Sequence, residues 1–178
     1  MKFPALETER LVLRELNAND AEDLFHLLSN KTAMKYWDAS PHENIETTKN
    51  SLHKMIAAWN NHDGVAWGIE LKDSHQLIGQ FSLHSPNKSK KEIQLGYLVH
   101  PMHWGNGYGS ESLNVAIKYC FDKACIKTIL AEVDPNNKSS VRILVKHNFK
   151  FKNFRKNDLT LNNKYYDTAV YELIKSID

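Results

Sequence analysis

Three closely spaced glycines in the segment Trp104-Gly105-Asn106-Gly107-Tyr108-Gly109-Ser110 constrain the fold of this chain more than any other feature. An apolar run at residues 93–99 precedes them and predicts a strand, and apolar positions from residue 110 onward recur at helical spacing. In such a strand-to-helix turn, several backbone N–H groups point into one concavity at the positive end of a helix. Because glycine has no Cβ, a phosphate can approach the backbone closely. The segment therefore predicts a diphosphate site.

Two common phosphate-binding motifs do not account for this turn. A Rossmann fingerprint has its third glycine one position later and an acidic residue about 20 residues further on, and a P-loop ends in Gly-Lys followed by Ser or Thr. The segment meets neither requirement. Since glycines also close ordinary loops, the turn alone is weak evidence, and its meaning depends on the rest of the chain.

Composition narrows the class of protein. The 178 residues are 42% hydrophobic, which predicts a single domain over residues 1–178 with a full core. The formal charge of +2 comes from 23 basic and 21 acidic side chains spread along the chain, so we expect no nucleic-acid partner. The short cluster of Lys88, Lys90 and Lys91 is typical of a solvated loop.

The cysteines and the apolar pattern indicate the compartment. Cys120 and Cys125 lie five residues apart without a second Cys or His pair at metal-ligand spacing, so we expect free thiols and no metal. The sequence contains no signal-peptide pattern and no apolar run near 18 residues. These features favour a cytoplasmic protein with no membrane partner.

Strand and helix patterns alternate along the chain. We expect strands at residues 10–16, 65–71, 76–84, 93–99, 128–133, 149–154 and 165–174, and helices at residues 20–30, 45–59, 110–124 and from residue 139 onward. The four polar residues 72–75 have the length of a hairpin loop. On the last helix, Val141, Leu144 and Val145 are expected to face inward.

Several segments together resemble one family. Leu95-Gly96-Tyr97-Leu98-Val99-His100-Pro101, followed by the glycine turn, is similar to the acetyl-CoA signature of the GNAT superfamily, especially its ribosomal-protein N-terminal acetyltransferase branch. Residues 8–14, 134–140 and 165–167 match the opening strand, a later loop and the closing hairpin of that branch. The resemblance implies an α/β (α+β) GNAT fold: a mixed, mostly antiparallel seven-stranded sheet with splayed fourth and fifth strands, flanked by four helices.

The resemblance also implies where acetyl-CoA binds. In such proteins pantetheine lies in the gap between the splayed strands, where the backbones of Leu98 and Val99 should pair with it. Asn137 matches an asparagine that bonds the cofactor arm, although it is also an N-cap candidate. The residues expected to hold the diphosphate are Trp104, Gly105, Asn106, Gly107, Tyr108, Gly109 and Ser110. Within this set, Trp104 replaces the family's Gln or Arg, and we prefer to interpret it as a hydrophobic plug beneath the turn.

Two residues carry the expected catalysis. Ser140 matches a hydroxyl that can donate to the departing thiolate, although a serine in a first turn can also bond its own backbone. Gln94 stands where the branch often has a carboxylate, and an amide can position a water or an amine but cannot take a proton. A water relay through Gln94 is preferred, while Glu92, Glu132 and His84 stay open as the base.

The acceptor sets how strong that base must be. Deprotonating an α-amine with a pKa near 8 costs roughly 1.4 kcal/mol at pH 7, whereas a lysine amine costs roughly 4.6 kcal/mol. We therefore expect an N-acetyltransferase that moves acetyl from acetyl-CoA to a protein N-terminus or small-molecule amine by direct attack. The alternative, motivated by Gln94, is a CoA-binding module without activity. The expected partners are acetyl-CoA and an amine acceptor, and a homodimer is compatible with the sequence.

Overall fold

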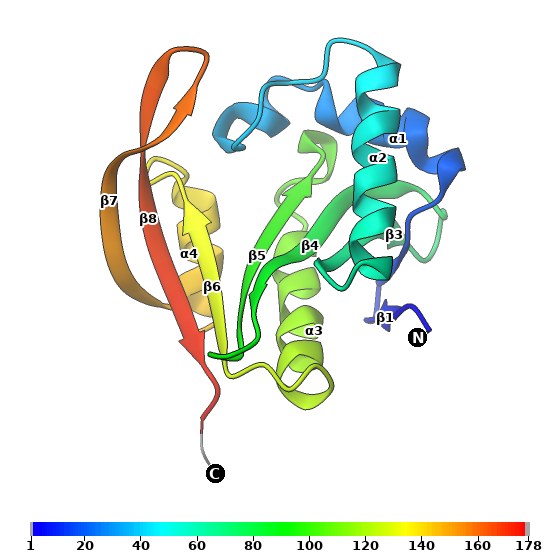
Figure 1. Ribbon diagram of the computed structural model, residues 1–178. Helices are drawn as coiled ribbons and strands as arrows, with labels where there is room; N and C mark the ends of the chain where they lie inside the picture. Colours follow the sequence, from blue (N-terminus) through cyan, green and yellow to red (C-terminus); the bar gives the residue numbers. More distant parts are fainter. Residues whose placement is uncertain (1, 177–178) are drawn as a thin grey trace.

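The computed structural model describes residues 2–176, and over this range the strands form one eight-stranded sheet in the order β1-β2-β3-β4-β5-β6-β8-β7 (Figure 1). The strands are β1 (Leu6–Glu7), β2 (Leu11–Glu15), β3 (Gly64–Leu71), β4 (Leu77–Asn87), β5 (Glu92–Val99), β6 (Thr128–Val133), β7 (Lys150–Leu161) and β8 (Lys164–Ile174). The helices are α1 (Ala21–Leu28), α2 (Ile45–Asn60), α3 (Tyr108–Asp122) and α4 (Lys138–Lys146), with short 3-10 turns η1 (Ala18–Asp20), η2 (Ala33–Tyr36) and η3 (Pro101–His103).

The α/β class, the four helices and the mixed sheet are confirmed, but the expected number of seven strands is wrong. The eighth strand is β1, a two-residue segment that pairs Leu6 with Leu13 and Glu7 with Val12. Two residues are too few to produce an alternating pattern. Strand β7 also runs seven residues past its expected end at residue 154, because its ladder with β8 resumes at Leu159 after the polar residues 156–158.

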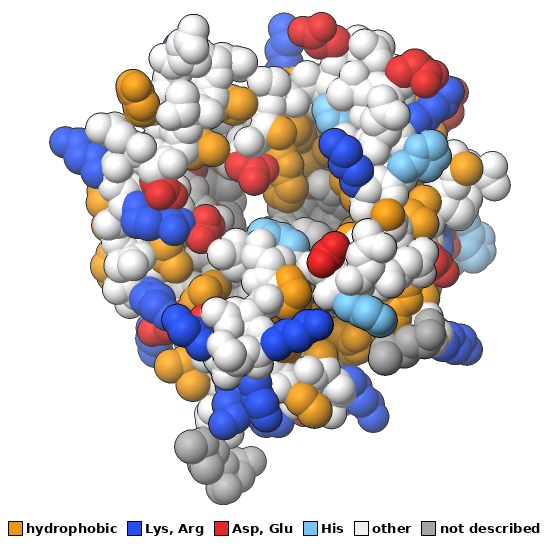
Figure 2. Space-filling model, viewed as in Figure 1, with side chains coloured by type: hydrophobic (Ala, Val, Ile, Leu, Met, Phe, Trp, Pro, Cys, Tyr) orange, Lys and Arg blue, Asp and Glu red, His pale blue; other side chains and the backbone are white. Residues whose placement is uncertain are grey.

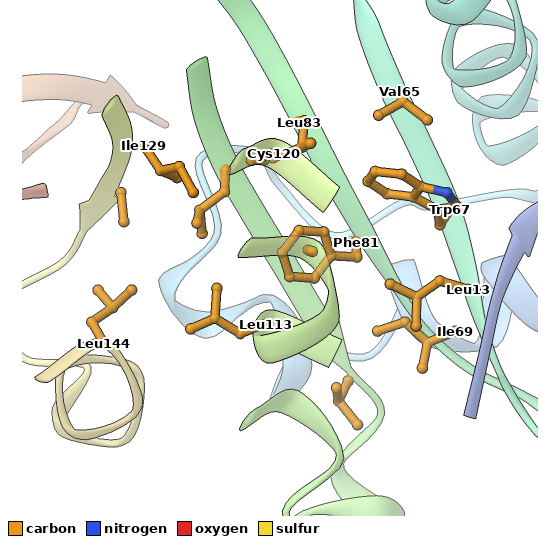
Figure 3. Packing of buried hydrophobic residues seen from close by; sticks show 14 of the residues in the cluster. Leu13, Val65, Trp67, Ile69, Phe81, Leu83, Leu113, Cys120, Ile129 and Leu144 are labelled. Atoms are coloured by element: carbon orange, nitrogen blue, oxygen red, sulfur yellow. The ribbon is translucent and has the colours of Figure 1, made fainter. Parts of the chain in front are cut away.

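Buried side chains cover both faces of the sheet. One cluster joins β2, β3, β4 and β5 to α3 and α4, and Figure 3 shows Leu13, Phe81 and Leu113 within it. A second cluster packs α1 and α2 against the opposite face, with Leu24 and Leu52 almost fully buried. The alternation of each strand therefore decides which of these two helical layers a side chain contacts.

One expected core position on α4 is wrong. Leu144 is 1% exposed and Val141 packs against the core, but Val145 is 56% exposed. The buried stripe of this short helix runs through Val141, Ile143 and Leu144, which leaves Val145 beyond its edge.

Strands β5 and β6 are parallel neighbours that separate part of the way along. Residues 92–95 pair with residues 128–131, and the pairing ends there. Residues 96–99 continue beside β4, whereas residues 132–133 continue beside β8. Figure 1 shows the two strands diverging beyond this point, as the expected splay of the fourth and fifth strands requires.

The lengths of the helices bear on membrane association. Among residues 2–176, no helix is both long enough and apolar enough to cross a membrane.

Candidate functional site

The glycine turn lies between η3 and α3 and leaves backbone N–H groups open. Gly105 and Gly107 have φ values of +81° and +83°. Residues with a Cβ adopt such values only at a cost in free energy. Gly107 is the N-cap of α3 and, as a glycine, it makes no side-chain cap hydrogen bond. Apart from its two chain neighbours, no heavy atom of the described residues lies within 4 Å of the position that a Cβ on Gly105 would occupy. The turn therefore has the open, amide-rich surface that a diphosphate needs.

Arg10 binds the backbone of this turn and the first turn of α3, a role that the sequence did not reveal. Its Nη2 donates to the carbonyl oxygen of Asn106 at 3.0 Å, and its guanidinium pairs with Glu111 at 2.6 Å. The same guanidinium lies 4.6 Å from the centre of the Tyr108 ring. Thr8 also donates to Glu111, at 2.5 Å. The match of residues 8–14 to the family's opening strand was the available signal.

The carboxylate of Glu111 is the centre of this contact. Partial burial alone would raise the pKa of Glu111, but hydrogen bonds from Thr8 and Arg10 outweigh it and hold the pKa below its ordinary value. The ionised carboxylate therefore ties the start of α3 to the segment between β1 and β2.

Trp104 is not a plug beneath the turn. Its side chain is 52% exposed, and its indole Nε1 donates to the carbonyl oxygen of Val99 at 2.6 Å. The 3-10 turn η3 carries the ring onto the surface, where the indole N–H joins the glycine turn to the last residue of β5.

The backbone of β5 alternates between β4 and the gap beside β6. His100 N donates to Ile78 O at 2.8 Å, so the backbone of His100 faces β4. Leu98 faces the same way, because it pairs with Gln80 in the ladder and its carbonyl oxygen points toward Gly79 on β4. Alternation then turns the backbone groups of Tyr97 and Val99 toward the gap. Of the two backbones expected to meet pantetheine, Val99 faces the gap and Leu98 belongs to the ladder with β4.

Ser140 lies on the α4 side of β5, beside a tyrosine that the sequence reasoning missed. Its Oγ is 3.1 Å from the hydroxyl oxygen of Tyr97. Burial raises the pKa of Tyr97, and the contact with Ser140 opposes that rise. The Tyr97 ring stacks on Phe81 at 5.9 Å and passes 3.5 Å from the Cβ position of Gly109. The third glycine of the turn thus leaves room for the tyrosine.

Asn137 caps helix α4, as the capping interpretation predicted. Its side-chain oxygen accepts a hydrogen bond from Ser140 N at 3.2 Å. The cap fixes the first turn of α4 and with it the direction of the Ser140 hydroxyl. The side-chain amide N–H groups of Asn137 still remain available to a ligand.

A cavity of about 250 Å³ opens on the other side of the splayed strands. Figure 2 shows a hollow in this face with acidic side chains at its rim. Gln94 lines the cavity together with its register partner His84 and with Glu132. Glu92 is absent from the lining and pairs with Thr128 where β5 and β6 are still joined. Gln94 and Ser140 therefore lie on opposite sides of β5, and the gap connects them.

The cavity wall is rich in carboxylates. Arg155 pairs with Glu132 at 2.7 Å and with Asp158 at 3.1 Å. These are ion pairs and not aligned hydrogen bonds, because Nε and Nη2 of Arg155 have no well-oriented acceptor among the described residues. The carboxylates that line the cavity are Asp38, Glu132, Asp134, Asp158 and Asp167.

His84 is the histidine among the described residues of this wall. Partial desolvation lowers its pKa below the ordinary value, and the charges of Asp38 and Glu132 act in the opposite direction without reversing the shift. The ring is accessible to solvent through the cavity, and its Nδ1 lies 3.2 Å from the hydroxyl of Ser85.

Comparison with known proteins agrees with this geometry. Residues 10–150 match the family model of the acetyltransferase (GNAT) domain. An uncharacterized N-acetyltransferase of Bacillus subtilis, YoaA, is 33% identical over 173 residues, which cover 97% of this chain and 98% of the relative.

Two solved structures share the fold. The ribosomal L7/L12 alpha-N-protein acetyltransferase RimL, in complex with coenzyme A, superposes with a TM-score of 0.87 at 19% identity, over 96% of this chain and 98% of that one. Spermidine N-acetyltransferase from Vibrio cholerae, in complex with CoA and spermine, superposes with a TM-score of 0.82 at 21% identity, over 94% and 96%. Because the family model spans most of the chain and a relative is 33% identical over nearly its whole length, the protein belongs to the GNAT acetyltransferase family.

Proposed function

We propose that the protein transfers the acetyl group of acetyl-CoA directly to a primary amine that enters through the cavity beside Gln94. The observation that carries this proposal is the gap between β5 and β6, with the open glycine turn near one end of β5 and the carboxylate-lined cavity on the other side. A donor with a diphosphate and a cationic acceptor can therefore meet across one opening.

Acetyl-CoA occupies the turn and the gap in this proposal. The diphosphate is bound by the backbone N–H groups of residues 105–110, which the helix dipole of α3 reinforces. The N–H of Val99 faces the gap, while its carbonyl oxygen is already taken by Trp104. We therefore assign pantetheine pairing to the backbone of Val99. Leu98 does not pair with pantetheine but holds β5 against β4. Asn137 makes a further contact with the cofactor arm.

The reaction needs one bond to form and one to break. The neutral amine attacks the thioester carbonyl, the C–N bond forms, and a backbone N–H near Val99 stabilises the developing oxyanion. The C–S bond then breaks, and the thiolate takes a proton from the hydroxyl of Ser140, which regains one from solvent by way of the neighbouring Tyr97 hydroxyl. The amine nitrogen gives up its proton to an acceptor on the cavity side, so that CoA–SH and the acetylated amine leave a protein with unchanged protonation. Gln94 accepts a hydrogen bond from the amine or holds a water beside it.

A covalent acetyl-enzyme plays no part in the proposal. Cys120 is fully buried in the core, and burial raises its pKa to about 12. Its thiol is thus protonated and out of reach. Cys125 is exposed on the loop after α3, away from the cavity lining. Direct attack by the amine needs neither thiol.

The carboxylates around the cavity favour an acceptor that is cationic before it loses its proton, such as a protein N-terminus or a small amine. The solved relatives named for ribosomal-protein and spermidine acetylation act on amines of both kinds. We place the reaction in the cytoplasm, since both cysteines are free thiols. A homodimer stays a prediction, which light scattering in solution can check.

Acetyl-CoA turnover with a panel of amines tests the proposal. Free CoA and a mass increase of one acetyl group on the amine should appear together, at a rate above the uncatalysed reaction. The panel should contain N-terminal peptides, a lysine peptide blocked at its N-terminus, and a polyamine. If the protein binds acetyl-CoA tightly and acetylates none of them, the alternative of a CoA-binding module without activity is correct.

A further inference from the structure

The attacking amine must lose a proton, and Gln94 cannot take it. An amide has no basic lone pair in the pH range of a protein, so it can only accept a hydrogen bond or position a water. The proton acceptor must therefore be another group on the cavity side of β5, within reach of Gln94. This inference rests on the proposed acetyl transfer.

His84 meets that requirement by position. It is the register partner of Gln94 across the β4–β5 ladder, so the two side chains lie on the same face of the sheet. Its Nε2 lies 3.8 Å from the position that a Cβ on Gly96 would occupy, at the start of the splay. The absence of a side chain on Gly96 thus leaves the ring open to the space beside the gap.

The contacts of the ring favour one tautomer. Nδ1 lies 3.2 Å from the hydroxyl oxygen of Ser85, to which an Nδ1–H can donate. In that tautomer Nε2 carries the free lone pair. The nitrogen nearest to Gly96 is then the one that can accept a proton.

The surrounding charges suit a proton acceptor. Partial desolvation lowers the pKa of His84, so the ring is neutral at pH 7 and its lone pair is available. The carboxylates of Asp38, on the segment after η2, and of Glu132, on β6, face the ring and stabilise the imidazolium that forms. Lys35 also lines the cavity, but its ammonium lies over the Tyr36 ring at 4.9 Å.

The other candidate bases are less suited. Glu132 is held in an ion pair with Arg155 at 2.7 Å, which must be weakened before the carboxylate can take a proton. Glu92 lies at the joined end of β5 and β6 and does not line the cavity. His84 has neither obstacle.

We propose that Nε2 of His84 accepts the proton of the attacking amine, directly or through a water held by Gln94. The amine nitrogen forms its bond to the acetyl carbon, its N–H proton passes to Nε2, and the imidazolium returns the proton to solvent through the cavity. His84 is then a catalytic residue on the acceptor side, opposite Ser140 on the donor side.

The test is the pH dependence of kcat/KM for the acceptor amine, measured at saturating acetyl-CoA with an amine of pKa near 8. The wild type should show a rise with pH whose midpoint lies below the ordinary histidine value of 6.5, separate from the ionisation of the amine. In His84→Ala this rise should disappear, and turnover at pH 7.5 should fall by about 100-fold. Added imidazole should restore part of the lost rate.

The controls separate this role from folding. His53→Ala, on the exposed face of α2, removes an imidazole away from the cavity and should leave the profile unchanged. Acetyl-CoA affinity of His84→Ala, measured by calorimetry, should equal that of the wild type. A rise that persists in His84→Ala, together with no response to imidazole, would overturn the assignment. Absence of turnover in the wild type would instead overturn the proposed function itself.

Discussion

The hydroxyl oxygens of Tyr97 and Ser140 lie 3.1 Å apart on the side of β5 that faces α4. If Ser140 protonates the thiolate, its loss should act on the transition state and not on cofactor binding. We expect Ser140→Ala to lower kcat at least tenfold and to change acetyl-CoA affinity less than twofold. Ser89→Ala, at an exposed position in the loop before β5, is the matched control. An equal loss of affinity would make Ser140 an anchor for acetyl-CoA.

Tyr97 should act through Ser140. Removing only its hydroxyl, in Tyr97→Phe, keeps the stacking on Phe81 and deletes the contact with Ser140. We expect kcat to fall less in Tyr97→Phe than in Ser140→Ala. The double variant should be no slower than Ser140→Ala alone, because the Tyr97 hydroxyl acts only through the Ser140 hydroxyl. Additive losses in this double-mutant cycle would show that the two hydroxyl groups act independently.

Gly107 should contribute to both the stability of the fold and the binding of acetyl-CoA. Its φ of +83° disfavours any side chain, and a Cβ there would lie 3.6 Å from Nη2 of Arg10, on the supporting side of the turn. We expect Gly107→Val to lower the free energy of unfolding by about 1 to 2 kcal/mol and acetyl-CoA affinity by at least tenfold. Asn148→Val, also at a positive φ but after α4, should impose similar strain without affecting affinity. Titration calorimetry with acetyl-CoA on both folded variants provides the measurement, and an unchanged affinity in Gly107→Val would contradict the role of the turn.

Glu111 should make stability depend on pH. The folded-state pKa of Glu111 lies below its ordinary value of 4.5, so the carboxylate stabilises the fold above that value. The contribution is lost as the pH falls through the folded-state pKa. We expect Glu111→Gln to lower Tm by roughly 3 °C at pH 7 and the difference from wild type to shrink in acid. Glu43→Gln, at an exposed position, serves as control. A difference that stays constant down to acid pH would contradict the role of the charge.

Local patterns were enough to predict most of the fold. Strand β6 and helix α2 were expected almost at their observed bounds, because apolar residues repeat there at the period of the element. Strand β1 and the second half of β7 were missed. Strand β1 has only two residues, too few for a repeat. In β7 the four polar residues 155–158 interrupt the apolar pattern before Leu159 and Leu161, and the ladder with β8 has a register shift there.

Some features of the candidate site could also be predicted from the sequence, and others could not. The glycine turn could be predicted because the chemistry of glycine is local. The contact of Arg10 with Glu111 joins residues 101 positions apart, and that of Tyr97 with Ser140 joins residues 43 apart. Such pairs depend on how the helices dock on the sheet. Trp104 was misplaced for a related reason, since only the path of η3 decides whether its ring points inward.

Gln94→Glu should change both the pH dependence and the choice of acceptor. A carboxylate at this position would lie beside His84 and raise the pKa of that imidazole, because a nearby negative charge favours the protonated ring. We expect the rise in kcat/KM to move to higher pH. Gln76→Glu, an exposed position before β4, should leave the profile in place.

The same variant should favour amines that hold their proton more tightly. Deprotonation of a lysine amine costs roughly 3 kcal/mol more than that of an α-amine at pH 7, and an added carboxylate can offset part of that difference. An N-terminal peptide should therefore react at nearly its wild-type rate, while a lysine peptide should gain. Profiles of both forms with both peptides provide the measurement. If the wild type already prefers the lysine peptide and the variant shifts neither the midpoint nor this preference, Gln94 does not face the reacting amine.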